Sequence, residues 1–176
     1  WMNKGLYPEM PFNHQMSIPV ELSLIGSGKN VLLTRWPVKE FKSLRKKTLR
    51  LDSQQIANWK TPLVIEMQSD LMEVSLSAVR RASGRLHMAI RGQAVIIDWD
   101  KGELEYQGHT VALPNSQTIE ILMLIDRASL EIFINKGVVS ASFPFLPGAC
   151  LNPLEIYSDG QQQVEKITAH ELASIW

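Results

Sequence analysis

The sequence predicts an all-β fold, a two-sheet antiparallel β-sandwich, over most of its 176 residues. The first observation is an apolar period of two in many short segments, which is the period of a half-buried strand. The second is that turn-forming residues separate these segments about every eight to twelve positions, a spacing typical of sandwiches. The third is size, because a domain of this length buries roughly 70% of the surface that its unfolded chain exposes and needs no disulfide or metal to be stable.

The first 37 residues do not read as a complete unit. An irregular, proline-punctuated lead-in is followed by alternating apolar residues, which predict a strand over 16–24. A turn at 27–30 and a partner strand over 31–36 would complete a hairpin. A lone hairpin is at best marginally stable in water, so we expect residues 1–37 to pack against another part of a protein.

Pro37 is suited to the first position of a short helix, and apolar residues follow it at 38, 41 and 44. The cationic residues lie near the C-terminal end of this helix, where the helix dipole favours them. We interpret the basic run 42–50 as a solvated face, because no aromatic stacking platform accompanies it. The sequence thus predicts a linker helix over 38–47 and the sandwich over 48–176.

Strand patterns fill the chain from about residue 48 onward. Alternation and turn signals place the strands of the sandwich at 63–69, 74–78, 86–90, 94–99, 103–107, 110–113, 118–125, 130–134, 138–143, 154–158 and 164–176. The clearest part is 118–143, where the polar turn 126–129 and the turn 135–137 join three strands.

The middle of that stretch carries a resemblance. Asp126-Arg127-Ala128-Ser129-Leu130-Glu131-Ile132-Phe133, followed by Asn135-Lys136-Gly137, resembles the "D-R-x-S-[VL]-E-[VI]-F-x-N-x-G" stretch of glycoside hydrolase family 32. This family contains levanases, inulinases, β-fructosidases and invertases. The stretch lies in its C-terminal lectin- or glucanase-like jelly roll, outside the catalytic domain.

Residues 10–24 are similar to the last blade of the five-bladed catalytic β-propeller of the same family. The resemblance therefore implies that residues 1–37 are a remnant hairpin of that propeller. Trp1-Met2-Asn3 is not the nucleophile motif, because Lys4-Gly5-Leu6 follows where that motif continues Asp-Pro-Asn-Gly. We interpret it as a fifth-blade sequence.

What the resemblance implies about function follows from this position. The parent would be a retaining glycoside hydrolase that cleaves β-fructosidic bonds in levan, inulin or sucrose. Its catalytic acids would all precede residue 1, so we expect no catalytic residue in this chain and no activity from the chain alone. The partner would be the catalytic propeller, and such parents are usually secreted, periplasmic or on the cell surface in bacteria.

We expect the motif residues to determine the fold and not to catalyse a reaction. Asp126 would accept backbone N–H groups of its own turn and Arg127 would pair with a neighbouring acid. The motif residues are Asp126, Arg127, Ser129, Glu131, Phe133, Asn135 and Gly137.

Several function classes are disfavoured by composition. Lys+Arg and Asp+Glu number 18 each, so no basic footprint for nucleic acid or an anionic membrane exists. No apolar run approaches the ~20 residues that span a bilayer. Cys150 is the only cysteine, and no His/Cys/Asp cluster has ligand spacing, so we expect no metal and no cofactor. Glu103 and Glu105 share a strand face but follow a turn, which favours a solvated edge.

Two alternatives remain open. The chain would be a free-standing carbohydrate-binding, lectin-like sandwich if its aromatic residues stacked on fructan or another sugar, and the candidates are Trp59, Trp99 and Tyr106. It would be a self-associating structural module if the apolar face of residues 1–37 formed a homodimer.

Overall fold

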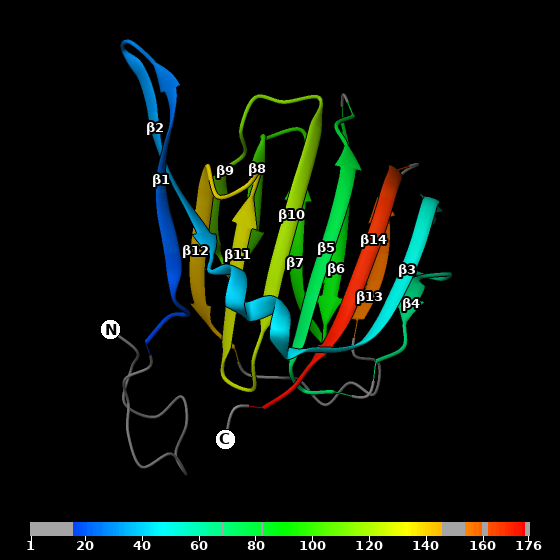
Figure 1. Cartoon of the computed structure of the whole chain (residues 1–176). Coiled ribbons are helices and arrows are strands. Elements are labelled where there is room, and N and C mark those ends of the chain that lie inside the picture. The colour runs from blue at the N-terminus through cyan, green and yellow to red at the C-terminus, as the bar shows by residue number, and fades with distance from the viewer. Residues whose placement is uncertain (1–15, 68, 82, 146–153, 160–161, 175–176) are drawn as a thin grey trace.

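The computed structural model describes residues 16–67, 69–81, 83–145, 154–159 and 162–174. The lead-in up to residue 15 and Cys150 lie outside the described residues. Two six-stranded antiparallel sheets lie face to face, and a two-stranded hairpin projects beside them (Figure 1). The predicted all-β, two-sheet sandwich is confirmed.

The sheet nearer the viewer in Figure 1, here called the front sheet, contains the central stretch of the sequence. Its strands lie in the spatial order β12 (Val139–Pro144), β11 (Ser129–Ile134), β10 (Thr118–Ile125), β5 (Met72–Val79), β14 (Gln162–Leu172) and β3 (Arg45–Ile56). The consecutive strands β10, β11 and β12 form the meander predicted over 118–143. On the other side, β5 pairs with β10 and β14 pairs with β5, although both strands are distant from β10 in sequence.

The back sheet lies behind it and consists of shorter strands (Figure 1). Its order is β4 (Leu63–Ile65), β13 (Leu154–Asp159), β6 (Arg85–Ile90), β7 (Gln93–Asp98), β8 (Glu103–Tyr106) and β9 (His109–Ala112). Strands β6 to β9 follow one another along the chain, so each turn needs only a few residues.

The core fills the space between the sheets. Ile121, Leu76 and Ile167 lie opposite one another on β10, β5 and β14, and all three are buried. The back sheet contributes its own inward row, including Leu86, Ile97 and Leu104. The period of two read from the sequence therefore corresponds to a real division between inner and outer faces.

The hairpin consists of β1 (Val20–Ser27) and β2 (Asn30–Pro37), and it leads through η1 (Lys39–Leu44) into β3. The linker helix is thus a six-residue 3-10 segment, shorter than the 38–47 that the sequence predicts. Strand β3 begins at Arg45, where Leu172 of β14 pairs with it. The guanidinium of Arg45 forms an ion pair with Glu73 of β5. Among the described residues, no helix is long and apolar enough to cross a bilayer.

Candidate functional site

A second, smaller apolar cluster lies on the outer face of the front sheet. Leu122 and Leu124 of β10 and Phe133 of β11 point away from the main core, yet they are only 7%, 5% and 2% exposed. Trp36 of β2 packs edge-on against Phe133, with ring centroids 5.9 Å apart. Ile18, Val20 and Phe41 also pack there. The base of the hairpin and the linker therefore cover this part of the sheet.

Backbone contacts reinforce this cover. The backbone N–H of Arg35 in β2 donates to the carbonyl of Gly137 at 3.0 Å. Gly137 has a φ of +83°, and a Cβ at this position would lie 1.9 Å from the carbonyl oxygen of Arg35. Only glycine permits both this conformation and this close approach of β2 to the turn between β11 and β12.

Glu131 occupies the outer face of β11 beside the same hairpin. Its side chain accepts a hydrogen bond from the hydroxyl of Ser142, and the residue is 5% exposed. Burial raises the pKa of the Glu131 carboxyl above its usual range, while Ser142 and the positive charge of Arg35 act in the opposite direction. A carboxylate on an outward face is normally solvated, so its burial here marks a covered surface.

The turn residues of the motif make local contacts. Asp126 Oδ1 accepts the backbone N–H of Arg127 at 2.6 Å, and the backbone N–H of Asp126 donates to the carbonyl of Ser129. Arg127 Nε lies 3.8 Å from Asp70 Oδ2. Asn135, at a φ of +47°, accepts the backbone N–H of Glu120 through Oδ1 at 2.8 Å. These contacts shape the two turns of the meander.

Sequence reasoning missed Arg91, which joins neighbouring loops at one end of the sandwich. Its Nη2 donates to the carbonyl of Asp70 at 2.9 Å and to that of Asp126 at 3.2 Å. The guanidinium also lies over the ring of Phe145, 4.9 Å from the centroid. No local sequence motif predicts the role of Arg91, because its partners are distant from it in sequence.

A groove of about 400 Å³ opens on the outer face of the front sheet, between that face and the linker. We call it the linker groove. Residues of β2, η1, β3, β5, β10 and β14, and Val38 between β2 and η1, line it. They are Trp36, Pro37, Val38, Phe41, Lys42, Arg45, Glu73, Ser75, Leu76, Ser77, Glu120, Ile121, Leu122, Leu124, Lys166 and Thr168.

The groove exists because small side chains stand on the central strands. Ser75 of β5 lies between Leu122 of β10 and Thr168 of β14 in one cross-strand row. In the next row Ser77 lies between Glu120 and Lys166. The short serines leave a hollow that the longer neighbours flank. The sequence shows the serines, but only the sheet order shows what flanks them.

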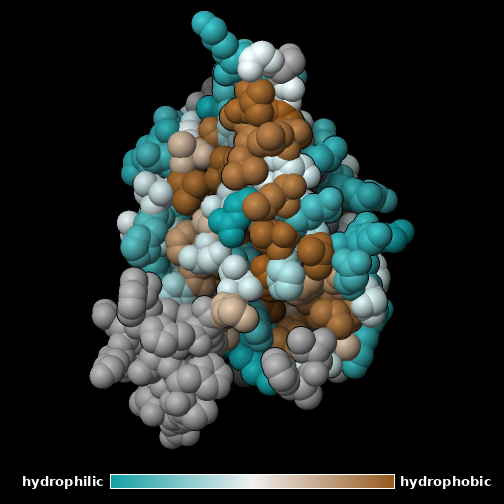
Figure 2. All heavy atoms as spheres, turned by 60° about the vertical axis from the view of Figure 1, so that its left-hand side comes forward, coloured by the Kyte–Doolittle hydropathy of each residue, from teal (hydrophilic) through white to brown (hydrophobic). Residues whose placement is uncertain are grey.

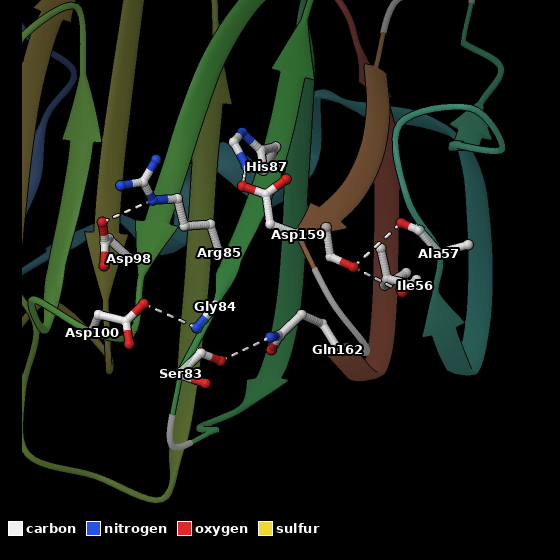
Figure 3. A network of polar contacts seen from close by, with 11 residues as sticks. Ile56, Ala57, Ser83, Gly84, Arg85, His87, Asp98, Asp100, Asp159 and Gln162 are labelled. Atoms are coloured by element: carbon white, nitrogen blue, oxygen red, sulfur yellow. Dashed lines mark hydrogen bonds and ion pairs between the residues drawn. The ribbon is translucent and has the colours of Figure 1, made fainter.

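The outer face of the back sheet carries a different arrangement, a network of polar contacts (Figure 3). Arg85 Nε donates to Asp98 Oδ2 at 3.0 Å, and His87 Nε2 lies 3.2 Å from Asp159 Oδ2. The backbone N–H of Lys101 donates to Asp98 Oδ1 and holds the pKa of that carboxyl below its usual range, with help from Arg85. All these contacts are between neighbouring strands or within a turn.

Part of that network joins the two sheets. Ser158 Oγ donates to the carbonyls of Ile56 and Ala57, and Gln162 Nε2 donates to that of Ser83 (Figure 3). The described residues contain no group of three or more histidine, cysteine or carboxylate side chains placed to hold a metal. The bonds of Ser158 and Gln162 connect the two sheets.

The three stacking candidates lie in different environments. Trp99 is 3% exposed and its Nε1 donates to Gln162 Oε1 at 2.9 Å, and Tyr106 is 1% exposed in the main core. Neither ring presents a face to a ligand, so the sugar-stacking hypothesis does not hold for these two. Trp59 is 67% exposed, with Lys60 Nζ 5.8 Å from its ring centroid. Glu103 and Glu105 lie half-buried on β8.

Comparison with known protein families identifies one that matches this chain. The model described as "Glycosyl hydrolases family 32 C terminal" matches residues 70–171. This range contains the whole motif and the strands from β5 through β13.

Relatives and solved structures agree with that match. The levanase of Bacillus subtilis (strain 168) is 22% identical over the whole chain, and that of Bacillus sp. (strain L7) is 23% identical. The chain spans 30% and 22% of the length of these two proteins. Exo-inulinase from Aspergillus awamori superposes with a TM-score of 0.75 at 16% identity, covering 96% of this chain and 38% of its own. Sucrose-6-phosphate hydrolase from Lactobacillus gasseri superposes with a TM-score of 0.66 at 19% identity, covering 89% of this chain and 33% of its own.

Proposed function

The chain belongs to the family of C-terminal domains of family 32 glycosyl hydrolases, and from this membership we propose that it supports the catalytic propeller of a fructan-cleaving enzyme. It is a β-sandwich module of the fructosidase type. The parent is levanase-like and hydrolyses β-fructosidic bonds, and the module stabilises and orients its catalytic domain through the hairpin.

The observation that carries this proposal is the apolar surface of the hairpin. Leu22, Leu24 and Leu33 are 61%, 72% and 56% exposed, and Leu24 lies directly opposite Leu33. The other face adds the opposed pair Ile25 and Leu32, also exposed. Figure 2 shows hydrophobic side chains gathered over the hairpin. A hairpin with apolar side chains on both faces is suited to a place between other strands, and the missing strands are those of the propeller.

A chimera tests the proposed support. We would replace the matching segment of the Bacillus subtilis levanase with this chain, and compare it with a chimera carrying Leu24→Ser and Leu33→Ser. We expect the double substitution to lower the melting temperature of the chimera and its levan hydrolysis at elevated temperature. The isolated chain should keep its melting temperature, because both leucines are exposed in it.

The matched control is Thr110→Ser on the exposed edge strand β9, which should change neither melting temperature. The proposal is contradicted if the double substitution leaves the chimera unchanged. It is also contradicted if the isolated chain releases fructose from sucrose, levan or inulin, because the catalytic acids would then lie within it.

Self-association through the same hairpin is the competing explanation for its apolar surface. It predicts that the isolated chain doubles in mass with rising concentration in light scattering, and that the two serine substitutions abolish the dimer. The levanase chimera would then retain its stability with those substitutions.

A further inference from the structure

The linker groove combines two kinds of surface. One wall is apolar: the half-buried Trp36, Val38 and Phe41 form its accessible surface, and Leu122 and Leu124 lie beneath them, at 7% and 5% exposure. The floor carries the hydroxyls of Ser75, Ser77 and Thr168. The Ser75 hydroxyl donates to the Thr168 carbonyl at 3.4 Å and the Ser77 hydroxyl to Glu165 Oε2 at 3.2 Å, so both serine oxygens remain as acceptors for a ligand. A ligand that fits both must present carbon-bound hydrogens on one side and polar groups on the other.

Three charged groups at the groove are free to bind: the ammonium groups of Lys42 and Lys166 and the carboxylate of Glu120. Glu120 and Lys166 stand on either side of Ser77 in one cross-strand row, and both are exposed. Within the described part of the chain, no other residue engages the Glu120 carboxylate or the Lys166 ammonium group. At the other end Glu73 is already paired with Arg45.

These features exclude other ligand classes. A peptide that binds by adding a strand needs an unpaired sheet edge, whereas the floor belongs to β5, which is hydrogen-bonded on both sides. A polyanion would meet the carboxylates of Glu73 and Glu120 beside the cations Lys42, Arg45 and Lys166, and one of these cations, Arg45, is already neutralised by Glu73, so little net positive charge remains to attract it. A purely apolar ligand would desolvate the hydroxyls of the floor without replacing their hydrogen bonds.

We propose that the linker groove binds a short neutral oligosaccharide and, resting on the function proposed above, one built of fructosyl units. The carbon-bound hydrogens of a sugar ring pack on the apolar wall, and its hydroxyl groups bond to Ser75, Ser77, Glu120 and Lys166. A volume of about 400 Å³ lies within the range of small-ligand pockets.

Isothermal titration of the isolated chain with an inulin-type trisaccharide is the test, with maltotriose as the matched glucose oligosaccharide. We expect saturable binding of the fructoside with a Kd on the order of 1 mM. Ser75→Phe fills the groove from its floor and should weaken binding at least tenfold. A substitution on the sandwich away from the groove should not weaken binding. Thr110→Phe, on the exposed strand β9 of the back sheet, is the control and should bind as the unsubstituted chain does.

A second variant keeps the test decisive if Ser75→Phe lowers the melting temperature. Lys166→Ala changes an exposed side chain and should weaken binding several-fold without affecting stability. Absence of binding, or binding that neither groove substitution changes, overturns the proposal. Equal binding of maltotriose overturns the fructosyl assignment.

The chimera separates failure of this proposal from failure of the proposed function. If the groove instead receives a part of the catalytic domain, the isolated chain binds no oligosaccharide and Ser75→Phe destabilises the levanase chimera. That result overturns the oligosaccharide proposal and leaves the supporting function standing. If the oligosaccharide binds but the hairpin substitutions leave the chimera unchanged, the supporting function fails alone.

Discussion

The outer faces of the two sheets both bury carboxylates, but they do so in different ways. On the front sheet, Glu131 is buried beside Phe133, which Trp36 of a hairpin about a hundred positions earlier covers, and Arg35 of the same hairpin acts on the Glu131 charge. On the back sheet, Asp98 is covered by Lys101 in the next turn and by Arg85 on the adjacent strand. The front face is thus assembled from distant segments, whereas the back face completes itself locally. An outer face covered from far along the chain has the construction of an interface.

Removal of the aromatic side chain beneath the hairpin should have the largest effect. Phe133→Ala removes a side chain that is 2% exposed and leaves Trp36 without its edge-on partner. We expect a loss of about 3–5 kcal/mol in the free energy of unfolding, measured with urea. On the back sheet, Tyr157→Ala removes a half-buried ring stacked on His87, and about 1 kcal/mol should be lost. Equal losses would mean that the two faces do not differ as described.

Gly137→Ala should come next. Its Cβ would lie 1.9 Å from the carbonyl oxygen of Arg35, so β2 must move away and the hydrogen bond between the two backbones must break. We expect a loss of about 2–3 kcal/mol from the strained conformation and the lost bond, with faster amide exchange across β2.

Gly108 is the matched glycine of the back sheet, because it also has a positive φ but no atom lies within 4 Å of an added Cβ. Gly108→Ala should lose only the conformational part, about 1–2 kcal/mol, without a change in amide exchange of the hairpin. Faster exchange in β2 of this variant would refute the assignment of the effect to close approach.

The pH dependence of stability should have opposite signs on the two faces. Burial raises the pKa of Glu131 in the folded state above 4.5, so its contribution to stability is full in acid and is lost as the pH rises through the folded pKa. Glu131→Gln should therefore flatten this decline in melting temperature. The glutamine oxygen can still accept the hydrogen bond from Ser142.

Asp98 is the counterpart, because Lys101 and Arg85 lower its folded pKa below 3.8. Its stabilisation is present above that value and is lost as the pH falls through the folded pKa. Asp98→Asn should make the protein less stable at neutral pH and reduce its loss of stability in acid. Melting temperatures are measured as a function of pH for both variants. The comparison is contradicted if Glu131→Gln and Asp98→Asn change the melting temperature over the same part of the pH range.

The smallest effect should follow from Arg85→Met. Arg85 has a side chain that is 47% exposed, so its ion pair with Asp98 is screened by water. We expect a change of about 0–1 kcal/mol in the free energy of unfolding, decreasing further with added salt. A loss of several kcal/mol would show that the back face also depends on its charges for stability.

The sequence predicted most of the strands because the inner residues keep their period of two. It was least successful with aromatic residues. Trp99 and Tyr106 each stand two positions after a core residue, Ile97 and Leu104, and therefore share their inward direction. Their position in the alternation determined their burial, whereas their residue type had suggested sugar stacking. Trp59 follows no such alternation and is exposed.

The site itself depended on information that local patterns do not contain. The alternation of β11 shows that Glu131 and Phe133 point away from Leu130 and Ile132. It does not show that Trp36 of β2 covers Phe133, because the contact joins segments about a hundred residues apart. The linker groove is similar, since β5 lies between β10 and β14 only through long connections. Strand order is set by the whole chain.

The hydrogen bond between Arg35 and Gly137 has a practical consequence for dividing the protein into parts. Two main chains meet there without a side chain between them, so this contact between hairpin and sandwich does not depend on a rotamer. We expect a sandwich shortened to begin at residue 38 to expose Phe133 and Glu131 and to aggregate. The unit that can be transplanted onto another catalytic domain should therefore begin before β1, and it should carry its orientation with it.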